Sequence, residues 1–214
     1  FAAPIAFTSN VSQTMTFAGA NLGGSEFTGT VTFDSSVVAG VTYTMATRGV
    51  VTGNTLTIRN SAGGATGYTI LDTSAANLAL SSGPLTLATF GELNSESSTV
   101  TVNGNVNVST ANAFVTNAGG SWTVSGSWTN STTSASWSFA GAILFRSGAS
   151  QTMTFKASPA EFGGTVTFDT TLAAGITYTM ATNALTLTGL LTIQNTVGGA
   201  TGNTVLTTSA ANLG

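Results

Sequence analysis

The sequence predicts an all-β protein, and within that class a parallel β-helix or β-solenoid of short strands. An internal repeat supports this most strongly: residues 29–78 and 164–213 match at an offset of 135, with 31 of 50 positions identical. Self-similarity of this length indicates a repeat architecture. Apolar residues and Thr alternate with period 2 in segments of three to six residues, a pattern typical of strands. No window carries a helical period long enough to predict a helix.

Short alternating strands also occur in tandem antiparallel β-sandwich domains, which are the alternative. Three features favour the solenoid. The strands are very short, the turns between them vary in length, and the second copy lacks three residues between the equivalents of Phe17 and Gly29. Frequent Thr-x-Thr usage also suits ladders of Thr on a flat, stacked sheet.

The repeat has a period of 138 residues, because residues 1–17 match residues 139–155 at that offset. The chain divides into a first copy (1–79), an unrepeated segment that holds all three Trp (80–138) and a second, truncated copy (139–214). No Pro-rich or charged linker separates these parts, which favours one continuous stack. Phe1 aligns with Phe139 in mid-chain, so we expect the sequence to be a window from a longer array.

In chain order, we expect strands at 14–17, 30–33, 41–45, 56–58, 69–71, 85–87, 100–108, 121–128 and 135–139. Asn103-Gly104 signals either a two-residue hairpin or a sharp corner between two coils. Trp122 and Trp128 would face the same side of one continuous strand, unless Gly126 forms a turn between them.

Differences between the two copies separate packed positions from dispensable ones. Val41 becomes Ile176, a small change of apolar volume that packed sites tolerate. Arg59 becomes Gln194, so we expect that position to be exposed and not essential. Asp34 is kept as Asp169, and an Asx-turn or a cap on backbone N–H groups explains it best.

Composition excludes several classes of function. Only 5% of the residues are charged, against about 25% in ordinary soluble domains. A net charge of −3 with four Lys and Arg gives no footprint for nucleic acid. The chain has no Cys, hence no disulfides or thiolate metal sites, and no apolar run long enough for a membrane span.

An enzyme is the least expected class, because the chain has neither His nor Cys to act as base or nucleophile. Glu92 and Glu96 are the only carboxylates close in sequence, and a solvated turn explains them better than a glycosidase pair. No Asp-x-Asp cluster predicts a calcium site, so we expect no catalytic residue, no metal and no cofactor.

The Trp residues and three sequons are the candidate site residues. Trp122, Trp128 and Trp137 would form a platform for stacking sugars if exposed, but we favour their packing in the core or between subunits. Asn10, Asn107 and Asn130 begin Asn-x-Ser/Thr sequons that a glycan could occupy, although such sequons arise by chance in a chain so rich in Asn, Ser and Thr.

A flat, uncharged Thr array could also order water and bind ice. That function requires regular spacing on one exposed face. The Thr-x-Thr pattern is interrupted at irregular intervals along this sequence, which favours the plain role of Thr as a strand residue.

The pieces Ser12–Phe17, Gly29–Phe33, Ala39–Met45 and Leu56–Asn60, with their second copies, resemble the repeats of very large, filamentous, adhesin-like bacterial surface proteins. The resemblance covers about two thirds of the chain. It implies a secreted or outer-surface protein with a β-helical shaft, and it implies no catalytic residues.

We therefore expect a structural protein that forms the shaft of an extracellular filament, sheath or adhesin, with copies of itself as partners. The alternatives are a surface module that binds a glycan or host surface through the Trp122/Trp128 region, and an ice-binding Thr array. Because so few groups titrate, we also expect stability and assembly to change little between about pH 5 and 9 or with salt.

Overall fold

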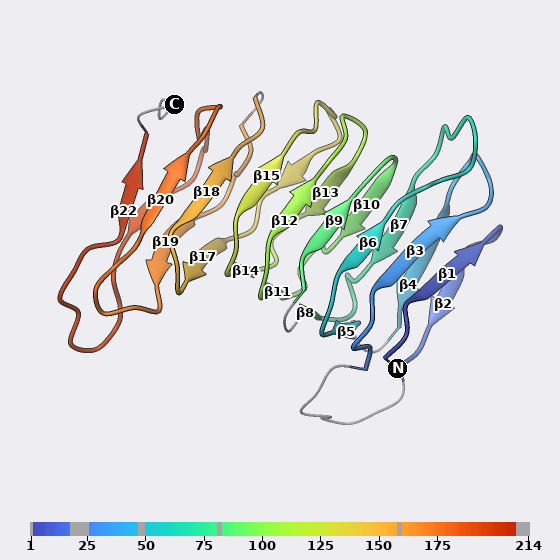
Figure 1. Cartoon of the computed structure of the whole chain (residues 1–214). Helices are drawn as coiled ribbons and strands as arrows, with labels where there is room; N and C mark the ends of the chain where they lie inside the picture. The colour runs from blue at the N-terminus through green and yellow to red at the C-terminus, as the bar shows by residue number, and fades with distance from the viewer. Residues whose placement is uncertain (1, 18–25, 47–49, 81–82, 158–159, 209–214) are drawn as a thin grey trace.

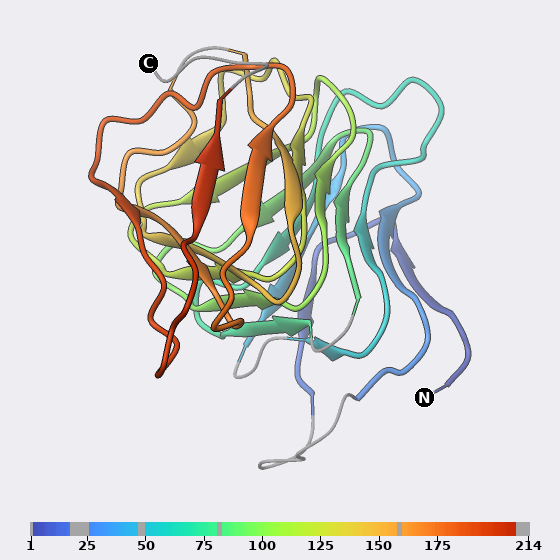
Figure 2. The same ribbon diagram turned by 60° about the vertical axis from the view of Figure 1, so that its left-hand side comes forward.

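The computed structural model describes residues 2–17, 26–46, 50–80, 83–157 and 160–208. This part of the chain contains no helix and is 43% strand, and its strands form a β-solenoid of about 7 turns. Strands β1 and β22 lie at opposite ends of the stack (Figure 1). In the view of Figure 2 the coils succeed one another along one axis.

The strands form three sheets, named A, B and C here, and every pairing in them is parallel. Sheet A contains β1 (Ile5–Ser9), β3 (Val31–Ser35), β6 (Leu56–Ile58), β9 (Leu85–Leu87), β12 (Val106–Val108), β15 (Trp128–Asn130), β18 (Gln151–Thr154), β20 (Thr177–Met180) and β22 (Val205–Thr207). Sheet B contains β2 (Gln13–Met15), β4 (Val41–Met45), β7 (Thr69–Asp72), β10 (Gly91–Asn94), β13 (Phe114–Asn117) and β16 (Ser138–Phe139). Sheet C contains β5 (Val51–Thr52), β8 (Leu78–Leu80), β11 (Val100–Val102), β14 (Trp122–Val124), β17 (Ile143–Ser147), β19 (Val166–Thr170) and β21 (Leu191–Ile193).

The predicted solenoid is confirmed, and the sandwich alternative is excluded because its sheets would be antiparallel. Asn103-Gly104 lies between β11 of sheet C and β12 of sheet A, so it forms a corner between coils and not a hairpin. A second corner at 125–127 separates Trp122 on β14 from Trp128 on β15.

Alternation along each strand builds the interior. In β4 the side chains of Val41, Tyr43 and Met45 are buried, while the Thr residues between them are half-buried on the outer side. Since each strand stacks on its counterpart one coil away, like side chains meet: Phe7 stacks on Phe33 with ring centroids 5.0 Å apart. This in-register stacking of apolar residues stabilises the solenoid.

The two copies of the repeat have the same local packing. Phe145 stacks on Phe168 at 5.1 Å in the second copy, as Phe7 stacks on Phe33 in the first. The hydroxyl of Tyr178 donates to the carbonyl of Asp169, as Tyr43 does to Asp34.

The copies nevertheless lie on different faces of the solenoid. Strand β1 is in sheet A, but its copy β17 is in sheet C; strand β4 is in sheet B, but its copy β20 is in sheet A. Along sheet C, Phe27 bridges to Thr52 in β5, and β8, β11, β14 and β17 follow in order. The 138-residue period therefore spans five complete coils of three faces each, and two faces of the next coil. Because two faces forward are equivalent to one face back, the second copy is rotated by one face.

Glycine is required where one coil turns tightly against the next. Gly40 has a φ of 78°, and a Cβ there would collide with the backbone carbonyl of Tyr68 in the neighbouring coil. Gly64 has a similar φ of 73°, but a Cβ there would meet no atom within 4 Å.

We predict that Gly40→Ala destabilises the protein more than Gly64→Ala. Both substitutions force a left-handed residue, which costs about 1–2 kcal/mol. Only Gly40→Ala also pushes two coils apart, which adds about 1–3 kcal/mol. Thermal unfolding of the two variants measures the difference, and equal losses would contradict the close approach at Gly40.

Candidate functional site

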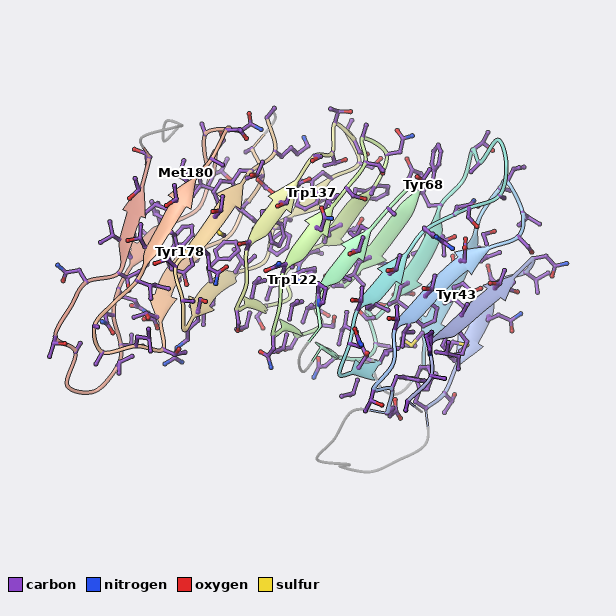
Figure 3. The ribbon with its side chains drawn as sticks, viewed as in Figure 1. Tyr43, Tyr68, Trp122, Trp137, Tyr178 and Met180 are labelled. Carbon is purple, nitrogen blue, oxygen red and sulfur yellow. The ribbon has the colours of Figure 1, made fainter. Side chains whose placement is uncertain are left out.

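The structure places all three Trp residues in the interior of the solenoid, where Figure 3 labels Trp122 and Trp137. Trp122, Trp128 and Trp137 are 1%, 0% and 8% exposed. Their rings pack edge to face, with centroids 6.2 Å apart for both Trp122–Trp128 and Trp128–Trp137. A sugar cannot stack on rings buried in this way, so the alternative of an exposed platform is wrong, the rings lie in the core as the sequence favoured, and a glycan-binding module would need another surface.

Each indole N–H donates to a group inside the protein. Trp122 donates to the Ser95 hydroxyl at 3.2 Å, and Trp137 donates to the backbone carbonyl of Glu161 at 2.8 Å. Trp128 donates to the side-chain Oε1 of Glu161 at 2.7 Å. Burial of these large side chains is therefore compatible with satisfied polar atoms.

Glu161 lies at the centre of this buried polar cluster and is 1% exposed. Besides Trp128, Asn130 donates to its Oε1 at 2.6 Å, and the backbone N–H of Lys156 donates to its Oε2 at 2.7 Å. Lys156 is itself 1% exposed. Burial raises the pKa of Glu161 to about 7, since the hydrogen bonds to its carboxylate offset only part of the cost of losing water.

This cluster corrects the expectation that almost nothing titrates between pH 5 and 9. Sequence reasoning missed Glu161, although one signal pointed to it: the residue is kept as Glu26 in the first copy, in a chain with seven acidic residues. Its partner Asn130 comes from the unrepeated segment, so the repeat alone could not reveal the cluster.

The three sequons lie in different environments. Asn10 is exposed after β1, and Asn107 is half-buried on the outer side of β12. Asn130 is 2% exposed and donates to Glu161, so its amide is not accessible for a glycan in the folded protein. The sequon prediction at Asn130 is corrected for that reason.

The repeated Asp residues connect neighbouring coils. Oδ1 of Asp34 accepts from the backbone N–H groups of Ser35 and Ser61, and Oδ2 accepts from the Ser61 hydroxyl and Arg59 Nε. Asp169 accepts from Thr170 and Thr196 in the same way. The expected backbone cap is present, and it reaches one coil further than an Asx-turn.

Each of these carboxylates also has an Arg partner, but from opposite sides of the stack. Arg59 of the following coil pairs with Asp34 at 2.9 Å, whereas Arg146 of the preceding coil pairs with Asp169 at 3.6 Å. Both Arg side chains are about half exposed, so the ion pairs add little to the hydrogen bonds. Burial raises the pKa of Asp34 and of Asp169, but the hydrogen bonds outweigh it and hold both pKa values below the ordinary range.

A shallow depression of about 520 Å³ lies where the turn after β6 meets the turn after β9. It is lined by Arg59, Asn60, Ser61, Ala62, Gly64, Ala65, Ala88, Thr89 and Phe90. The side-chain amide of Asn60 donates to the backbone carbonyl of Gly67 in its own turn and to that of Val37 in the preceding coil. Arg59 bonds Asp34 through its Nε. Arg59, Asn60 and Ser61 of the depression therefore have structural partners.

Among the described residues, no group of three or more acidic side chains could hold a metal ion, and no helix is long and apolar enough to span a membrane. No family model, curated protein or solved structure matches the chain.

We predict that the free energy of unfolding falls as pH rises from about 4.5 to 7. The folded pKa of Glu161 is raised above its ordinary 4.5, so the contribution of this carboxyl is complete below pH 4.5 and is lost by about pH 7. Ionising it inside the fold costs up to about 3 kcal/mol. Glu161→Gln should remove most of this dependence in urea unfolding measured across that range.

Glu92→Gln serves as the control, because burial also raises the pKa of Glu92 but the side chain lies outside the Trp cluster. An unchanged pH profile in Glu161→Gln, with the dependence removed in Glu92→Gln, would contradict the role of Glu161.

We also predict that Asp34→Ala lowers the free energy of unfolding by about 2–3 kcal/mol, because it removes the buried, charged acceptor of the backbone N–H and the hydroxyl of Ser61 in the next coil. Asp72→Ala is the matched control: Asp72 is half-buried on the outer side of β7, and the second copy has Thr at this position. Equal effects of the two variants in urea unfolding would argue against a connection between coils through Asp34.

Proposed function

We propose that this chain is a structural protein, a segment of the shaft of an extracellular filament, sheath or adhesin. One observation carries the proposal: the strands at the two ends of sheet A are copies of strands that are paired on both edges elsewhere in the same molecule. Strand β1 is the copy of β17, which pairs with β14 on one side and β19 on the other. Strand β22 is the copy of β7, which pairs with β4 and β10.

The free edges of β1 and β22 therefore have the sequence of edges that accept another parallel strand inside the solenoid. An edge strand with unpaired N–H and C=O groups pairs readily with further strand. In a repeat stack each coil contacts only its neighbours, so more of the same sequence lengthens the rod without changing it. This supports the role of a shaft, whose task is to span a distance.

Surface composition supports the same role. The outward residues of the strands are mostly Thr, Ser and Asn, and the chain is 5% charged. Neutral faces allow close lateral packing of shafts without charge repulsion, and such contacts are less sensitive to salt than ion pairs. The proposed surface location and self-association come from the resemblance to bacterial surface repeats.

We predict a constant increase in rod length for each added repeat. Chains carrying one, two and three 138-residue periods should lengthen by about 27 Å per period, because five and two-thirds coils at about 4.8 Å each make that distance. Electron microscopy and small-angle scattering measure the length. Flexible strings of globular units, or unequal increments, would contradict a continuous shaft.

A further inference from the structure

The outward surface of sheet A carries two columns of small polar residues, which we call the Thr face. The first column is Thr32, Thr57, Thr86, Asn107, Thr129 and Thr154. The second column lies two residues earlier in the chain, where backbone hydrogen bonds continue the ladder just before most of the strands, and is Thr30, Thr55, Pro84, Asn105, Ser127, Thr152 and Thr179. Figure 1 shows the strands of sheet A side by side in one row from β3 to β20.

This alignment bears on the ice-binding alternative, which the irregular spacing of Thr residues along the sequence disfavoured. Consecutive members of the first column are separated by 25, 29, 21, 22 and 25 residues, which looks irregular along the chain. The turns absorb these differences, and the strand registers bring the members opposite one another. Irregular spacing in sequence therefore becomes regular spacing in space.

The array has a fixed geometry. Members of a column stand about 4.8 Å apart, and the two columns are separated by about 6.6 Å, the distance between alternate residues of a strand. Thr has a restricted χ1, so its hydroxyl and methyl groups hold their directions. Side-chain ladders of this kind also favour flat sheets.

The Thr hydroxyls of the first column are available to solvent. In the part of the chain that the structure describes, the side chains of Thr32, Thr57, Thr86, Thr129 and Thr154 make no hydrogen bond to another residue, and all five are half-buried on the outer side. Their bonding capacity is therefore left for water.

Among the described residues, the other two sheets carry no such face. The outward residues of sheet B include Asp72 and Glu92, and in sheet C the column through Thr123 and Thr167 is interrupted by Leu144. Among the described outward positions of the two columns, the Thr face has no charged residue and no aromatic ring.

We propose that the Thr face of sheet A binds ice. Regularly spaced hydroxyls, each beside a methyl group, can hold a layer of water in repeated positions, and a growing ice surface can incorporate that layer. Ice suits this face better than a crystalline polysaccharide, because sugars are usually held by aromatic rings and none stands on these columns. It also suits this face better than a second copy of the chain, because lateral packing needs only a neutral surface, whereas unpartnered Thr hydroxyls in register are a feature of sheet A.

The inference goes beyond the proposed shaft, which needs no particular face. It is tested on the purified 214-residue chain by thermal hysteresis and by partition into a growing ice hemisphere. We expect measurable hysteresis and enrichment in the ice. Thr86→Lys, at the centre of the first column, should reduce both by more than half.

Thr123→Lys is the matched control, because Thr86 and Thr123 are both the half-buried central residues of three-residue strands. We expect the control to keep full activity. Circular dichroism establishes that both variants are folded, and Thr86→Val, which keeps the shape and removes the hydroxyl, replaces Thr86→Lys if that variant does not fold.

Absence of hysteresis and of ice enrichment in the unsubstituted chain overturns the inference, as does an equal loss in Thr123→Lys. Retention on cellulose or chitin without ice enrichment assigns the face to a polysaccharide and overturns it too. Concentration-dependent association that Thr86→Lys abolishes, again without ice enrichment, identifies a contact between copies. None of these results changes the rod length on which the proposed shaft depends.

Discussion

The parallel hydrogen-bonded ladder that joins each coil to the next is the constraint on which the rest of this structure depends. A parallel strand can pair only with a strand one coil away, so every inward side chain meets a counterpart at the same position of the neighbouring coil. The interior becomes a set of columns, such as the stacked Phe7 and Phe33. Stability then comes from contacts between neighbouring coils, and a poorly packed side chain weakens the contacts of its coil with both adjacent coils.

The ladder explains the placement of the few charged groups. Asp34 and Asp169 each bind backbone N–H groups of the following coil, and they are kept in both copies because the turn they hold is the same. Their Arg partners come from different coils, since only the carboxylate has a fixed role. Glu161 is the exception, a carboxyl held in the interior by Trp128 and Asn130.

Rotation of the second copy by one face has a consequence for the surface. The strands with Thr at 30 and 32 supply sheet A in the first copy, but their equivalents at 165 and 167 supply sheet C in the second. Continuity of the Thr face across sheet A therefore does not come from the repeat alone. Residues of the unrepeated segment, Thr86 and Thr129 among them, complete it.

The sequence by itself determined the fold class. Period-2 alternation decides which side chains of a strand turn inward, and the repeated block with its variable turns indicated one stack of short strands. It did not determine on which sheet a strand lies. Paired residues of neighbouring strands in sheet A are separated by between 21 and 29 residues of sequence, so a strand can be assigned to a sheet only when the strand registers are known. For that reason the tertiary structure alone decided that Trp128 and Trp137 donate to Glu161, that the copies are rotated, and that unevenly spaced Thr residues stand in line.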